Sequence, residues 1–164
     1  LTLDGMAFMK YGAVSDGAPE RGTQHIPLRG DHAAIRWMQE NVSGSPVIVE
    51  ANSVEYHWGT RYTIYTGLPG VVGWNWHQRQ QRTVVSSDWV FERVEAVHEF
   101  YQTQDLDWAQ DFLEKYGVRY ILFGQLEQAK YTGPGLDKFE AQDGILWREV
   151  FRDRQTAIYE VIHK

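Results

Sequence analysis

The sequence contains no cysteine and no long apolar run. The lack of cysteine excludes disulfides, thiol catalysis and Cys-ligated zinc or iron–sulfur clusters. No stretch approaches the roughly 20 apolar residues that cross a bilayer, and no secretory signal peptide is recognisable. The first residue is leucine, so we expect a chain cut from a longer protein.

Positive charge is also scarce. The 164 residues include 16 Lys and Arg against 22 Asp and Glu, which gives a formal net charge of −6. Proteins that bind nucleic acids or anionic lipid surfaces carry the opposite excess, so no nucleic-acid partner is expected. Apolar residues make up 43 % and charged residues 23 %, as in ordinary globular proteins. The length suits a single soluble domain over residues 1–164.

Several catalytic motifs are missing from the sequence. It has no G-x-G-x-x-G or P-loop pattern for phosphates, no G-x-S-x-G nucleophile elbow and no H-E-x-x-H zinc motif. We therefore expect no cofactor and no metal site, and we assign no catalytic residue.

Hydrophobic periodicity predicts three helices and four strands. Apolar residues recur at helical spacing over 32–42, 88–102 and 107–116. Asp31 is expected to cap the first helix, and Asp107 the third, with Gln110 three residues later as in a capping box. Gly117 follows the last turn. Continuous apolar runs predict buried strands at 46–51 and 119–123. Residues 146–151 and 156–162 flank a polar turn, which is typical of a hairpin.

This order of elements predicts an α/β fold. We expect a central, mostly parallel sheet flanked by helices, with the C-terminal antiparallel hairpin at its edge. Residues 1–30 show little periodicity and many turn residues, so they are expected to be an irregular lead-in to an α/β core over 31–164.

Polar side chains follow the two buried strands. In open α/β sheets ligands bind beyond the carboxyl ends of parallel strands, so Glu50, Asn52 and Glu127 are candidates to face a crevice there. An alternative is that Glu50 and Glu127 cap a helix or pair with an arginine. A third interpretation makes them the acid/base pair of a hydrolase, which needs carboxylates about 5–10 Å apart.

Residues 56–82 have an unusual composition, with four glycines, three tryptophans and two histidines beside several arginines. Planar rings next to amides and guanidinium groups suit sugar recognition, but the same mixture forms rigid aromatic subcores. Burial of Trp58, Trp74 and Trp76 would favour the structural interpretation. A metal bound by His57, His77 and Glu50 is disfavoured because no zinc-type spacing occurs.

The same segment carries a family resemblance. Residues 66–69 running into Gly73 and Trp74, followed by His77, Gln78, Gln80 and Arg82, resemble the signature of the YYY family. These are polytopic membrane proteins of archaea and green non-sulfur bacteria. Further likenesses occur in order at residues 3–6, 31–37, 49–51, 61–63 and 115–127, so the resemblance covers most of the chain from 3 to about 161.

Two residues depart from the family pattern. Gln78 stands where a glutamate is expected after the histidine, and Gln81 stands where a tryptophan is expected. The first departure weakens any assignment of a catalytic acid at this position.

The resemblance implies a role at a membrane. The family is similar to membrane glycosyltransferases that use lipid-linked sugars and carry a soluble C-terminal domain outside the membrane. By this analogy the chain is such a domain at the extracytoplasmic face of the cell membrane, and the catalytic acids lie in the missing membrane module. Its partners would be that module of the same polypeptide and a glycan or lipid-linked sugar.

Two functions follow from these observations. In the first, the domain binds or positions a glycan or acceptor through Glu50, Asn52, His57, Arg61, Trp74, His77, Gln78, Arg82 and Glu127. In the second, residues 56–82 form a structural surface that packs on the membrane module and has no ligand.

Overall fold

The computed structural model describes residues 5–17, 22–53, 57–73 and 88–162. Its main sheet has four strands in the order β3-β4-β6-β5, formed by Val47–Val49, Val118–Phe123, Thr156–Val161 and Trp147–Asp153. A separate antiparallel pair joins β1 (Ala13–Asp16) to β2 (Gln24–Pro27). It lies within residues 1–30, and the 3-10 helix η1 (Ala7–Lys10) precedes it.

The prediction of a mostly parallel sheet is wrong. Only β3 and β4 run parallel, whereas β4–β6 and β5–β6 are antiparallel. The reason is the place of the C-terminal hairpin in the sheet. A parallel pair needs a long connection, and residues 50–117 between β3 and β4 provide one. The connection between β4 and β5 is also long, but β6 lies between these two strands in the sheet. β5 and β6 are joined by Arg154 and Gln155 alone, so they can only be antiparallel. The chain is α/β overall, and the hairpin occurs where the sequence predicted it.

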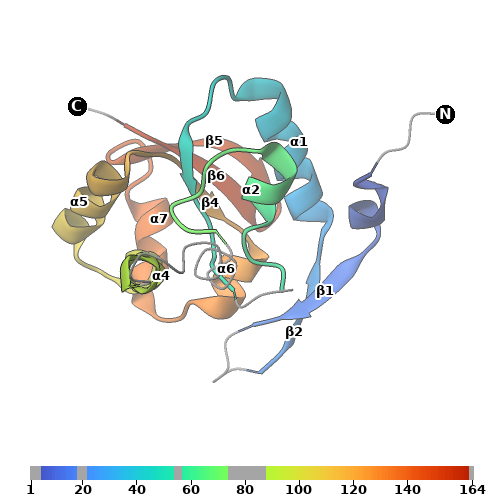
Figure 1. The fold of residues 1–164 in the computed structure, drawn as a ribbon, viewed down its shortest axis with the longest axis horizontal. Coiled ribbons are helices and arrows are strands. Elements are labelled where there is room, and N and C mark those ends of the chain that lie inside the picture. Colours follow the sequence, from blue (N-terminus) through green and yellow to red (C-terminus); the bar gives the residue numbers. More distant parts are fainter. Residues whose placement is uncertain (1–4, 18–21, 54–56, 74–87, 163–164) are drawn as a thin grey trace.

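Helices cover both faces of this sheet (Figure 1). On one face pack α1 (Arg29–Asn41) and α2 (Arg61–Thr66). On the other lie α4 (Asp88–Gln102), α5 (Leu106–Tyr116) and α7 (Lys138–Ala141), the last preceded by the 3-10 helix η2 (Pro134–Asp137). Helix α6 (Gln125–Lys130) directly follows β4 and packs against β1 and β2.

Side chains of β4 alternate between the two hydrophobic cores. Tyr120 and Leu122 belong to the core under α1, whereas Ile121 and Phe123 belong to the core under α4 and α5. Because successive strand residues point to opposite faces, a sheet covered on both sides needs a continuous apolar run. This confirms that 119–123 is a buried strand.

The predicted helices are confirmed, but two caps are misplaced. Asp31 lies inside the first turn of α1, whose N-cap is Leu28, so its assignment as the cap is wrong. The third helix is capped by Asp105, whose carboxylate accepts from the Trp108 N–H at 3.0 Å, two residues before the predicted start. Gly117 ends that helix with φ 61°, the left-handed conformation that glycine tolerates best.

Residues 69–71 extend the sheet beyond β3. The Ile48 N–H donates to the Pro69 carbonyl at 2.9 Å, and the Val71 N–H donates to the Ile48 carbonyl at 3.1 Å. The turn of the 66–69 signature thus covers the free edge of β3, which would otherwise expose unpaired backbone groups. Through this contact, residues 61–73 are fixed beside the strand end that carries Glu50.

Candidate functional site

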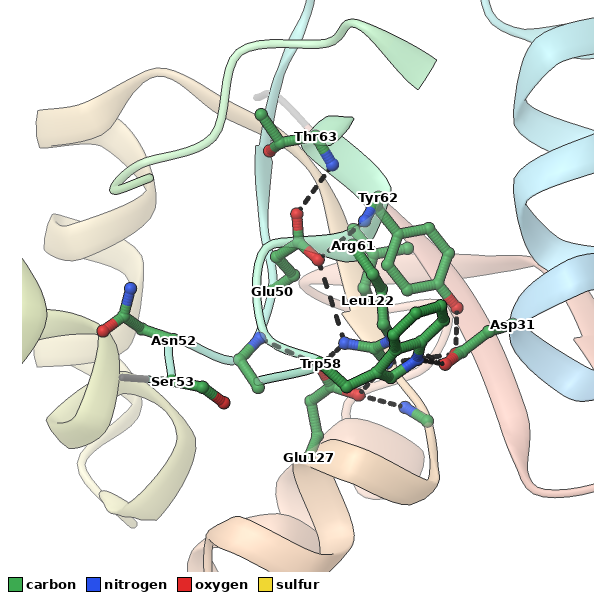
Figure 2. A network of polar contacts seen from close by, with 12 residues as sticks. Asp31, Glu50, Asn52, Ser53, Trp58, Arg61, Tyr62, Thr63, Leu122 and Glu127 are labelled. Atoms are coloured by element: carbon green, nitrogen blue, oxygen red, sulfur yellow. Dashed lines mark hydrogen bonds and ion pairs between the residues drawn. The ribbon is translucent and has the colours of Figure 1, made fainter. Parts of the chain in front are cut away.

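A buried network of charged groups lies at the ends of β3 and β4, centred on Arg61 (Figure 2). Arg61 is the first residue of α2 and is only 1 % exposed. Its Nε and Nη2 donate to the two carboxylate oxygens of Asp31 at 2.6 and 3.1 Å. Its Nη1 and Nη2 donate to the two oxygens of Glu127 at 3.0 and 2.9 Å. One guanidinium therefore holds two carboxylates by paired hydrogen bonds, the strong form of this contact.

The oxygens of Asp31 accept two further bonds. The indole Nε1–H of Trp58 donates to Oδ2 at 2.6 Å, and the hydroxyl of Tyr62 donates to Oδ1 at 2.9 Å. Burial first, and the neighbouring Asp31 second, raise the pKa of Tyr62 well above its ordinary value, so this hydroxyl stays a donor. Asp31 is thus fully engaged by side chains from α2 and from the loop before it.

Glu127 is completely buried and bonded on all sides. Its Oε1 accepts from the Ala51 N–H at 2.8 Å and its Oε2 from the Gly124 N–H at 2.9 Å, in addition to Arg61. Burial alone would raise the pKa of Glu127, but the charge and hydrogen bonds of Arg61 lower it. A side chain at position 124 would crowd this pair, because a Cβ there would lie 3.3 Å from both Arg61 Nη2 and Glu127 Oε2.

Glu50 interacts with the backbone of helix α2. Its two oxygens accept from the backbone N–H groups of Tyr62 and Thr63, at 2.9 and 2.8 Å, so it caps the start of α2. It lies 3.8 Å from Arg61 Nη1. Burial raises the pKa of Glu50 to about 7, and the partial attraction of Arg61 does not offset this. The negative charge of the nearby Glu127 raises this pKa further.

Two of the sequence candidates are thus explained by contacts within the chain. Glu50 caps a helix and Glu127 pairs with an arginine, as the alternative interpretation of these carboxylates described. Both are at most 5 % exposed. Both carboxylates lie close to Arg61 Nη1, so their separation does not argue against the hydrolase interpretation. What argues against it is that the oxygens of both groups already accept hydrogen bonds from within the protein.

Asn52 and His57 lie near the Arg61 network, but their side chains contact other residues. The side-chain amide of Asn52 donates to the Gly73 carbonyl at 3.0 Å. The ring of His57 is about half exposed, and its Nδ1 lies 3.5 Å from Asp16 Oδ1 at the end of β1. Asp16 also accepts from the Trp58 N–H at 3.0 Å. Figure 2 shows Asn52 pointing away from the Arg61 network.

Four of the predicted site residues lie outside the described residues, namely Trp74, His77, Gln78 and Arg82. Trp76 lies outside them as well. Of the three tryptophans used to weigh the 56–82 segment, only Trp58 is described, and it is half-buried. Within the described ranges, no group of three His, Asp or Glu side chains is arranged to hold a metal ion.

Sequence reasoning missed Asp31 and Tyr62 as members of the network. A signal for Asp31 was available, since it falls at positions i, i+3, i+4 and i+7 with Ala34, Ile35 and Met38. This spacing places it on the buried face of α1. A buried acid on that face requires a cation, and only the tertiary structure shows that the cation is Arg61.

The fold and the network together define an α/β domain with a mixed sheet and a sealed ionic centre at the strand ends. The sequence matches no protein-family profile and no curated protein, so the resemblance to the YYY family stays a prediction.

A solved structure shares this fold. It is the C-terminal globular domain of an oligosaccharyltransferase from Archaeoglobus fulgidus, with a TM-score of 0.52 and 16 % identity. The match covers 80 % of this chain and 95 % of that domain. No helix among the described residues is long and apolar enough to cross a membrane.

Proposed function

We propose that this chain is the extramembrane domain of a membrane glycosyltransferase-like protein. In this role it binds or positions a glycan or acceptor beside the membrane-spanning part of the same polypeptide, on the extracytoplasmic side. The observation that carries the proposal is the fold likeness, which takes in nearly the whole of the oligosaccharyltransferase domain. The order of motifs from residue 3 to about 161 supports it independently.

The Arg61 network supports this role by holding the strand ends rigid. It ties α1, α2, β3 and α6 together through Asp31, Arg61, Glu50 and Glu127. Groups that position a substrate gain most when their supporting shell is fixed before binding. In this proposal the buried acids and Arg61 support the site, and the contacts to a ligand are made by more accessible neighbours such as His57.

Ligand titration monitored by NMR tests the proposal. The chain would be titrated with neutral saccharides and, separately, with a soluble short-chain polyprenyl phosphate. We expect backbone amide shifts around residues 52–53, 57–60 and 130, which lie beside the network and include the half-exposed His57 and the Lys130–Ser53 hydrogen bond. Glycerol at equal concentration is the control. Shifts that the glycerol control reproduces, or shifts scattered over the surface, would contradict specific binding.

A docking function is the second candidate, and one observation favours it. Large apolar side chains are exposed on α2 and at the 3-10 helix η1, namely Ile64 at 51 % on the first and Phe8 at 50 % and Tyr11 at 96 % at the second. If neither ligand class shifts any amide, the glycan-positioning function fails and this structural alternative takes its place.

A further inference from the structure

A second polar feature lies on the other side of α6. A pocket of about 320 Å³ is bounded by β2, by α6 and by the turn between β5 and β6. Four glutamines line it, Gln24, Gln125, Gln128 and Gln155, together with His25. We call this feature the glutamine pocket. We infer that it binds a neutral saccharide, which deepens the function proposed above and rests on it.

The chemistry of the lining selects the ligand class. Each glutamine amide offers both hydrogen-bond donors and acceptors, and so does each sugar hydroxyl. Among the described residues that line the pocket there is no Asp, Glu, Lys or Arg, so none of these lining side chains carries a permanent charge to pair with a phosphate or a carboxylate. The apolar members, Ile26 and Ala129, are each 3 % exposed and offer little surface to a lipid tail. The pocket therefore fits an uncharged sugar and not the lipid phosphate of a carrier.

Hydrogen bonds hold part of the lining in place before any ligand arrives. Gln125 Nε2 donates to Gln155 Oε1 at 2.8 Å, and Gln128 Nε2 donates to the Gln155 backbone carbonyl at 3.0 Å. The hairpin turn that presents Gln155 is tight, with Arg154 in the left-handed region at φ 55°. Because these groups are ordered already, binding costs less conformational entropy.

The buried network anchors the same helix. Glu127 lies between Gln125 and Gln128 in α6, and its carboxylate is fixed by Arg61 and by two backbone N–H groups. The opposite wall is continuous with the His57 region, because Gln24 pairs with Asp16 in the β1–β2 ladder. The glutamine pocket and the strand ends are thus two sides of one rigid unit built on α6.

Side-chain amide signals of the glutamines provide a direct test. The ¹⁵N-labelled chain would be titrated with mannose, N-acetylglucosamine and maltotriose, with glycerol as the control. We expect shifts of the side-chain NH₂ signals of Gln24, Gln125, Gln128 and Gln155. Gln24→Ala and Gln125→Ala should each weaken binding about fivefold, the effect of one hydrogen bond. Gln104→Ala removes an exposed glutamine between α4 and α5 and should leave binding unchanged.

The outcomes separate this inference from the proposed function. Saccharide shifts at residues 52–60 without any at the four glutamines would overturn the pocket and leave glycan positioning in place. Equal weakening by Gln104→Ala and Gln24→Ala would also overturn it. If no saccharide shifts any signal, the pocket is wrong. The separate titration with polyprenyl phosphate then decides whether the domain acts on the carrier or only docks.

Discussion

An arginine such as Arg61 can either bind a ligand or pair with acids inside the protein. Its position in an aromatic, glycine-rich segment suggested the first, a group that binds sugar oxygens. In the folded chain it holds oxygens of Asp31 and Glu127 instead, and only 1 % of it is exposed. Burial alone would lower its pKa, but the two carboxylates raise it above its ordinary value, so Arg61 remains charged.

Replacement of Arg61 tests the importance of this charge. Arg61→Met keeps an unbranched stem but removes the guanidinium group, which leaves two buried carboxylates without a cation. We expect a loss of about 3–5 kcal/mol in the free energy of unfolding, measured by urea denaturation. Arg119→Met is the matched control, because Arg119 is half exposed and pairs with Glu160 on the surface; it should cost at most about 1 kcal/mol. Similar losses in both variants would contradict a central role for the network.

The short elements depend on contacts beyond their own residues. Helices α2 and α6 have six residues each, fewer than an isolated helix needs to be stable in water. Glu50 caps the first, and Glu127 accepts the Gly124 N–H at the start of the second. Neither helix was predicted, because six residues are too few for a helical period to be recognised. The longer α4 was predicted with its observed bounds, since its five buried residues recur at helical spacing along it.

The start of α5 gives a test at this scale. The structure assigns the cap to Asp105, whereas the sequence pattern favoured Asp107. Asp105→Ala should lower the free energy of unfolding by about 1 kcal/mol, because the Trp108 N–H loses its partner. Asp107→Ala should cost less, since it removes only a charge near the helix N-terminus. Chemical denaturation of both variants distinguishes them, and a larger loss for Asp107→Ala would show that the cap is misassigned.

Two buried ionisable groups shape the stability of the whole molecule. Burial raises the pKa of Glu50 to about 7 from an ordinary 4.5. Burial also lowers the pKa of Lys138 to about 7 from 10.5, although its Nζ donates to the Tyr101 and Gly135 carbonyls at 3.0 and 2.9 Å. Each group is easier to bury when neutral, and near pH 7 both are partly charged.

The signs of these shifts predict a minimum in stability near neutral pH. The contribution of Glu50 is fully present below pH 4.5 and is lost as the pH rises through 7, a change of up to about 3 kcal/mol. The contribution of Lys138 is present above pH 10.5 and is lost as the pH falls toward 7. Unfolding by urea between pH 5 and 9.5 should therefore show the smallest free energy near pH 7.

Variants separate the two limbs of this profile. Glu50→Gln should flatten the limb between pH 5 and 7, and Lys138→Met should flatten the limb between pH 7 and 9.5. Arg119→Met, which touches neither group, should preserve the shape. A wild-type profile with its maximum near pH 7 would contradict both assignments.

The sequence by itself determined the α/β class, the three long helices, the buried strand of 119–123 and the C-terminal hairpin. These features depend on periodicity and turn residues, which are local. The tertiary structure decided that the sheet is mixed, because pairing of β6 with β4 joins segments that no local pattern relates. It also decided that Arg61 faces Asp31 and Glu127, which lie 30 and 66 residues away along the chain. Whether a carboxylate is a ligand-binding group or a buried partner depends on such distant contacts, since burial and charge pairing are properties of the assembled fold.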